Sequence, residues 1–155
     1  MTKRAFLLLA ALLLIAPFAG IAADATNADS VLGVWHTGGN KCQVRISKKD
    51  NVYFGEVVSI TQPNWPADDK LGMGGKPRTD RKNPDPKLRD RPLTGIRIMN
   101  GFVYAGENIW KSGTVYDPES GKTYSGKMTL KKDGKLELRG FLGISLLGRT
   151  DVWTR

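Results

Sequence analysis

Apolar and polar residues alternate along most of the chain from Val31 onward. Within residues 41–47, Cys42, Val44 and Ile46 share one face, and the residues between them are polar. A period of two is typical of a half-buried β-strand and not of a helix, whose period is 3.6 residues.

The same alternation recurs at short intervals. It predicts strands over 52–60, 109–116, 122–130 and 147–154, and Leu136 and Leu138 alternate with charged residues between the last two ranges. Tight turns separate them, most clearly at residues 132–134, where Asp and Gly tolerate positive φ. No convincing amphipathic helix follows, and residues 143–146 offer at most a short turn.

Strands joined by tight turns predict an all-β, antiparallel, up-and-down meander of about eight strands. Such a meander removes its exposed edges by closing into a barrel. A two-sheet sandwich is the alternative.

The segment 61–93 interrupts this pattern. It holds six of the eight prolines, three glycines and eight basic residues against five aspartates. Loops of this length in compact domains are usually functional or disordered. We therefore predict a long Pro/Gly-rich charged loop that acts as a lid or recognition arm at one rim.

Two leucines and two arginines near the end of this loop suggest how it is held. Leu88 and Leu93 are expected to insert into the core. Arg89 and Arg91 either present charge to a ligand or pair with neighbouring aspartates, Asp85 and Asp90.

The N-terminus is typical of a secretory signal peptide. Lys3 and Arg4 precede an apolar run over 5–18, and small residues follow over 19–25. We predict a signal peptide over 1–23, cleaved either after Ala23 or after Ala25. A single barrel domain is then predicted over 24–155. The run is short for a membrane span, so the processed protein is expected to be periplasmic or secreted, not transmembrane.

The chain is strongly basic, with a formal net charge of +9. Cleavage after Ala25 leaves +8, because Lys3, Arg4 and Asp24 are removed. Such an excess favours anionic surfaces, among them envelope lipid and acidic proteins. The export signal argues against nucleic acid as a partner.

Candidate catalytic and metal chemistry is sparse. With one histidine, His36, and one cysteine, Cys42, the chain has no Cys/His zinc set and no intramolecular disulfide. It has no G-x-S-x-G elbow, and the glycines at 72–75 lack the Ser or Thr of a phosphate loop. No cofactor, metal site or catalytic residue is predicted.

Two acidic residues, Glu56 and Asp151, are the candidates for acid–base chemistry. Glu56 is expected on the outer face, since buried unpaired acids are rare. Asp151 shares a face with Arg149 and Trp153, where it forms either a buried ion pair with Arg149 or part of the rim.

Long stretches of the chain resemble a known family. Residues 83–95 (NPDPKLRDRPLTG), 116–124, 136–150 and 153–155 are similar to the domain of unknown function 2147, a bacterial family of small exported proteins. The resemblance implies a lipocalin-like closed barrel with an internal calyx, and no enzymatic activity or ligand to carry over. Many relatives have cysteines near both ends of the long loop, where this chain has Phe54 and Thr94, so no thiol role is transferred.

The sequence Gly33-Val34-Trp35 is similar to the G-x-W motif of lipocalins. There the Trp closes the barrel floor beneath an arginine, by a cation–π contact that Arg149 or Arg155 could make here. The predicted floor residues are Gly33, Trp35, Arg149, Trp153 and Arg155.

These observations favour a non-enzymatic exported binding protein that holds a small, partly apolar ligand in a β-barrel calyx. The candidate ligand contacts are Arg89, Arg91, Tyr53 and Tyr124. The alternative is a basic envelope interaction protein with a filled barrel that contacts anionic lipid or an acidic protein. An enzyme that uses Glu56 or Asp151 with an arginine is a third hypothesis.

Overall fold

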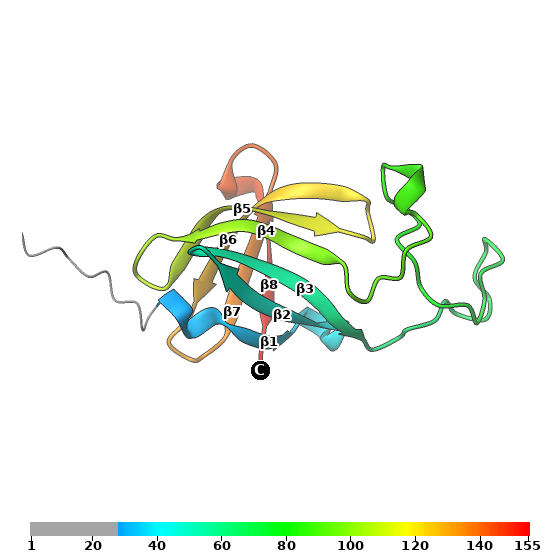
Figure 1. Cartoon of the computed structure of the whole chain (residues 1–155), viewed down its shortest axis with the longest axis horizontal. Helices are drawn as coiled ribbons and strands as arrows, with labels where there is room; N and C mark the ends of the chain where they lie inside the picture. The colour runs from blue at the N-terminus through cyan, green and yellow to red at the C-terminus, as the bar shows by residue number, and fades with distance from the viewer. Residues whose placement is uncertain (1–27) are drawn as a thin grey trace, which may run out of the picture.

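The computed structural model describes residues 28–155, which form one antiparallel sheet of eight strands in sequence order (Figure 1). The all-β, up-and-down barrel predicted from the sequence is confirmed. The predicted signal peptide lies outside the described residues. The strands are β1 (Gly33–His36), β2 (Cys42–Lys49), β3 (Val52–Ile60), β4 (Arg97–Tyr104), β5 (Ile109–Asp117), β6 (Lys122–Leu130), β7 (Leu136–Phe141) and β8 (Arg149–Trp153).

The first and last strands meet and nearly close the barrel. The His36 amide donates to the Thr154 carbonyl (2.7 Å), and the Thr154 amide donates to the His36 carbonyl (3.0 Å). This bridge joins the two edges of a single eight-stranded sheet, so the two-sheet sandwich alternative is wrong.

Two details differ from the sequence prediction. Strand β4 was not identified, and β8 begins at Arg149 instead of residue 147. The helical turn near the last strand is the 3-10 segment η4 (Ser145–Leu147). The other 3-10 segments are η1 (Asp29–Val31), η2 (Gly38–Asn40) and η3 (Pro86–Leu88).

The connections alternate between two ends of the barrel. Residues 50–51, 105–108 and 131–135 turn at the closed end, where η1 also lies. The open end carries four connections: 37–41, 61–96, 118–121 and 142–148. We call residues 61–96 the arm; Figure 1 shows it in green, extending away from the barrel.

The closed half of the barrel is filled by large side chains. The Phe102 ring of β4 packs on two glycines of the next strands along the sheet, Gly113 of β5 and Gly126 of β6. A Cβ on Gly113 would overlap the Phe102 ring, so glycine is required for this packing. Tyr53 packs edge-on against Trp110, with ring centroids 6.1 Å apart. The fully buried members of this core include Trp35, Met99, Phe102, Trp110, Met128 and Leu136.

The floor at the closed end is built around Trp35. Its indole N–H donates to the Val31 carbonyl (2.8 Å), and the Arg155 guanidinium lies 4.3 Å from its ring centroid. Arg155 also donates to the carbonyls of Ser30 (2.8 Å) and Leu32 (3.3 Å). Arg155 therefore makes the cation–π contact, and Arg149 lies at the other end of β8.

Within residues 28–155, no helix has the length and apolar character needed to cross a bilayer. The same residues bring together no group of three or more His, Cys, Asp or Glu side chains that could hold a metal ion.

The glycine support of Phe102 can be tested by replacing Gly113 with Ala. We expect Gly113→Ala to lower the free energy of unfolding by about 1 to 3 kcal/mol, because the added methyl group displaces a fully buried ring. The control is Gly140→Ala, where the nearest atom to the new Cβ is Tyr124 Cβ at 3.5 Å. Equal effects of the two variants in denaturant titrations would contradict the packing argument.

Candidate functional site

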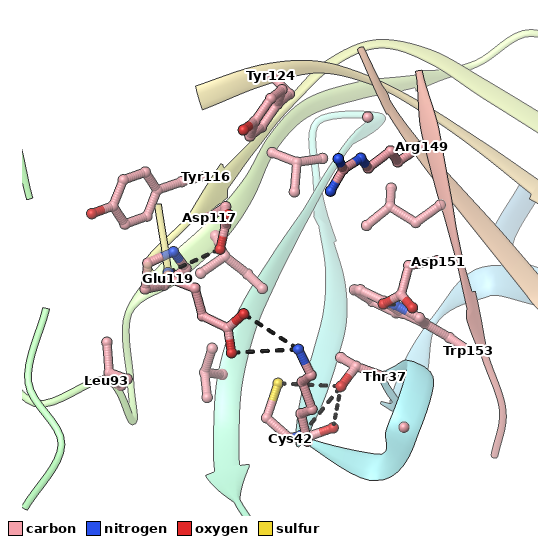
Figure 2. Close-up of a pocket in the computed structure, with 18 of the residues that line it drawn as sticks. Thr37, Cys42, Leu93, Tyr116, Asp117, Glu119, Tyr124, Arg149, Asp151 and Trp153 are labelled. Atoms are coloured by element: carbon pink, nitrogen blue, oxygen red, sulfur yellow. Dashed lines mark hydrogen bonds and ion pairs between the residues drawn. The ribbon is translucent and has the colours of Figure 1, made fainter. Parts of the chain in front are cut away.

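The open half of the barrel is hollow. A cavity of about 1030 Å³ opens between the four connections at this end (Figure 2). The filled barrel of the alternative hypothesis is therefore wrong for this half, although it describes the closed half. The lining includes Thr37, Lys41, Cys42, Val57, Ile60, Arg78, Leu93, Ile98, Val115, Asp117, Glu119, Tyr124, Leu138, Leu142, Leu147, Arg149, Asp151 and Trp153.

The wall of the cavity is apolar. Strands β3, β4, β5 and β7 each contribute an aliphatic side chain: Val57, Ile98, Val115 and Leu138. Trp153 of β8 is 2% exposed and belongs both to the core and to the cavity lining, so it separates the filled half from the hollow one. An apolar wall of this kind favours an apolar guest over water.

Most charged groups at the rim already have partners. Lys41 pairs with Glu119 (3.3 Å) across the mouth, and Figure 2 shows this contact below the β5–β6 hairpin. The Asp117 carboxylate accepts from the Glu119 amide (2.9 Å) and from the Ser120 hydroxyl (2.6 Å). These contacts fix the hairpin and leave little of its charge for a ligand.

Arg149 differs from the other charged lining residues. Its side chain forms no hydrogen bond or ion pair with any residue between 28 and 155. Figure 2 shows its guanidinium directed into the cavity. The ion pair with Asp151 that the sequence allowed does not form.

Asp151 is engaged elsewhere. Its carboxylate accepts from the Trp153 indole N–H (2.7 Å) and from the Gly38 amide (3.3 Å). The Trp153 bond satisfies a buried donor, so Asp151 has a structural use at the base of the mouth.

Cys42 faces the cavity from β2 and is half-buried. Its sulfur lies 3.6 Å from the Thr37 hydroxyl. Burial raises the pKa of the thiol, since it disfavours the thiolate. Cys42 therefore contributes a neutral, weakly polar surface to the lining.

The four predicted ligand contacts are scattered. Tyr124 lines the cavity, but Tyr53 is buried in the closed half and donates to Asp29 (2.7 Å). Burial, together with this bond, raises the pKa of Tyr53 to about 12. Arg89 and Arg91 both lie in the arm and outside the cavity lining.

Arg91 belongs to a buried cluster around Asp80, which is fully buried. Two nitrogens of Arg91 donate to Asp80 Oδ2 (2.8 and 3.0 Å), and Asn83 donates to the same oxygen (2.7 Å). The Tyr116 hydroxyl donates to Asp80 Oδ1 (2.6 Å). The predicted pairing of Arg91 with Asp85 or Asp90 is therefore wrong. Its partner is Asp80, 11 positions earlier in the sequence.

Of the other predicted anchors of the arm, Arg89 and Leu93 make contacts that hold it, and Leu88 does not. Arg89 donates to the Asn83 carbonyl (2.8 Å) and so bridges the arm to itself. Leu88 is 38% exposed and does not enter the core, because the short helix η3 holds it outside. Leu93 packs against the core and lines the cavity mouth.

The Asp80 cluster fastens the arm to the barrel. Tyr116 lies at the end of β5, and the following hairpin approaches so closely that a Cβ on Gly121 would overlap the Lys82 carbonyl. The two family-like stretches, 83–95 and 116–124, thus meet in space. Farther along the arm, Arg81 stacks on Trp65 (3.5 Å) and pairs with Asp69 (3.0 Å).

Glu56 faces outward, as expected, and pairs with Arg97 (2.9 Å) on β4. It has no access to the cavity, which removes one of the two acids on which the enzyme hypothesis rested. The likeness to the lipocalin G-x-W motif placed Arg149 in the floor. This prediction is wrong, because Arg149 begins β8 at the open end.

The nearly closed barrel, its Trp35–Arg155 floor and its single open end define a lipocalin-like fold. A solved structure with this fold is similar: protein HP1028 from Helicobacter pylori, described as belonging to the lipocalin family. The two share 23% sequence identity with a TM-score of 0.66, over 80% of this chain and 81% of that one.

The chain belongs to the family described as uncharacterized protein conserved in bacteria (DUF2147), whose model matches residues 33–155. The resemblance seen in the sequence is thereby confirmed. No curated protein matches the chain.

Removing the Asp80 charge should release the arm. We expect Asp80→Asn to lower the free energy of unfolding by about 2 to 4 kcal/mol, since it leaves Arg91 without its buried partner. Limited trypsin digestion should then cut faster within residues 61–96. Asp90→Asn is the control, because the Asp90 side chain makes no contact of this kind with the described residues; identical digestion of both variants would refute the role of Asp80.

Tyr116 should make the fold sensitive to alkali. Burial and the bond to Asp80 raise its pKa to about 12, whereas an unfolded tyrosine ionises near about pH 10. The stability contributed by the protonated phenol is therefore complete below about pH 10 and is lost as the pH rises toward about 12. In this window the free energy of unfolding of Tyr116→Phe should fall by about 1.4 kcal/mol less per pH unit than that of the wild-type protein. Urea unfolding at a series of pH values measures both. Parallel pH profiles for both proteins would count against this assignment.

Proposed function

We propose that this protein is an exported, non-enzymatic binding protein that holds a small amphipathic ligand in the open half of its barrel. The observation that carries the proposal is the cavity of about 1030 Å³ with an apolar wall and one unpaired cation. Small-molecule pockets typically enclose about 300 to 1,000 Å³, so the space suits one such ligand.

The wall supports an apolar body for this ligand. Val57, Val115 and Leu138 offer aliphatic surface but no hydrogen-bonding groups. Burial of a hydrocarbon portion against them is favourable by about 25 cal/mol per Å² of area removed from water. Lipocalin-like barrels of eight strands can hold one small ligand, and the fold shared with HP1028 supports the same use here.

Arg149 supports an anionic end. A guanidinium binds a carboxylate or phosphate through parallel hydrogen bonds, and Arg149 has no such partner among the described residues. Its place at the start of β8 puts this charge at the mouth, above the apolar wall. The ligand would then lie with its hydrocarbon inward and its charge near the rim.

The signal peptide predicted over residues 1–23 supports export, and we propose that the protein acts in the periplasm or outside the cell. The positions of the two acids considered for catalysis support a binding role. Glu56 is outside the barrel, and Asp151 accepts from Trp153 and Gly38. The arm would frame the mouth through Arg78 and Leu93.

Calorimetric titration with a medium-chain fatty acid and the alcohol of the same chain length tests this function. Both ligands are expected to bind with one site per chain. Arg149→Gln should raise the Kd of the fatty acid by about tenfold to a hundredfold and leave the Kd of the alcohol nearly unchanged. The matched control is Lys127→Gln, which removes one cation from the outer face of β6.

A second variant, Val115→Phe, narrows the cavity and should weaken both ligands. If neither ligand binds the wild-type protein, the cavity proposal is wrong. If both bind and Arg149→Gln has no selective effect, only the anionic end is wrong.

A further inference from the structure

The loop between β7 and β8 exposes an unusual amount of apolar surface. Among its seven residues, 142–148, four large aliphatic side chains are 60–84% exposed. They are Leu142 (62%), Ile144 (60%), Leu146 (84%) and Leu147 (77%). Figure 1 shows this loop, in orange to red, projecting from the barrel. Apolar patches of this kind mark interaction sites on soluble proteins.

Hydrogen bonds hold the backbone of the β7–β8 loop. The Arg139 guanidinium donates to the carbonyls of Ser145 (2.7 Å) and Leu146 (3.0 Å), and to the Thr150 hydroxyl (2.8 Å). Amides at 147 and 148 donate back to carbonyls at 144 and 145 within the loop. These bonds satisfy polar backbone groups that would otherwise oppose transfer into an apolar medium.

Cations flank the loop. Lys127 and Arg139 are in register on the outer faces of β6 and β7, and Arg149 follows the loop directly. Neither β6 nor the loop contains an acidic residue, and Glu137 of β7 pairs with Lys131 (3.6 Å). With these cations and no acid in the loop, the patch is complementary to an anionic surface, as is the chain as a whole, which carries a formal charge of +9, or +8 after cleavage at Ala25.

We infer that the β7–β8 loop docks the protein on an anionic lipid bilayer, with Ile144 and Leu146 among the acyl chains. Lys127 and Arg139, which are in register on β6 and β7, then lie nearest the headgroup phosphates. This surface differs from the basic loop 61–93 that the charge pattern favoured. In that arm, Arg81 and Arg91 are already tied to aspartates.

The shape of the patch favours a bilayer over a second protein chain. A stable protein interface takes about 20 to 30 residues from each side, and the loop offers four apolar side chains at a projecting tip. A tip of this size can enter the boundary between headgroups and acyl chains, where the gain follows the apolar area buried. The loop also adjoins the cavity, because Leu142 and Leu147 line its mouth.

Vesicle flotation tests the inference without reference to any cavity ligand. The wild-type protein is expected to bind vesicles that contain phosphatidylglycerol more strongly than vesicles of phosphatidylcholine alone. The double variant Ile144→Ser/Leu146→Ser should lower binding to the anionic vesicles by about tenfold or more. Neither residue lines the cavity, so fatty-acid uptake should be unaltered.

Leu71→Ser is the matched control, because Leu71 is equally exposed (71%) but lies in the arm. It should bind vesicles like the wild-type protein. The inference is overturned if the wild-type protein does not bind anionic vesicles, or if the double variant binds as well as the control. It is also overturned if light scattering shows that the double mutation only converts a dimer to a monomer, since a second copy then covers the loop.

Discussion

The pairing of the first strand with the last is the constraint on which the rest of the structure depends. Two backbone hydrogen bonds between His36 and Thr154 bring the edges of the sheet together. Arg155 continues this contact by lying on Trp35 and binding the carbonyls of residues 30 and 32. Without this closure β8 would be an open edge, and neither a sealed floor nor an enclosed cavity could form.

Closure alone leaves the interior undefined, and the distribution of large side chains decides which half is hollow. The Phe102 ring lies over β5 and β6 because Gly113 and Gly126 leave room for it. Trp110 and Trp35 fill the remaining space of the closed half. Beyond Trp153 the strands contribute shorter aliphatic side chains, Val57, Ile98, Val115 and Leu138, to the wall and leave the cavity between them. The cavity is thus a consequence of residue size along otherwise equivalent strands.

The alternation of apolar residues predicts the strands of the meander, since it reports directly on the two faces of each strand. It left a sandwich open, and the family resemblance supported the closed barrel. The alternation failed at β4, where Ile98 and Met99 are both buried and the register with β3 shifts on both sides of Gly55. The family-like stretches were recognisable, but their contact through Asp80 was not, because it joins residues 36 positions apart. The wrong placement of Arg149 in the floor also reflects missing information on long-range pairing. The sequence shows which face of its strand Arg149 occupies, whereas the end of the barrel at which it lies depends on the strand register.

The two long connections at the open end are built on opposite principles. The arm is polar and is fastened by buried charge. The Asp80 carboxylate accepts from Arg91 and Tyr116, outside its own turn, and from Asn83 within it. Such a cluster is specific in geometry but costly to desolvate. The β7–β8 loop is apolar, and Arg139 binds its backbone while leaving its side chains in solvent. Exposing Leu146 and Ile144 contributes nothing to the stability of the isolated chain, since neither packs against the core. A loop whose backbone is ordered and whose apolar side chains are unburied is therefore best explained by contact with a surface outside the protein, next to the mouth through which a cavity ligand would pass.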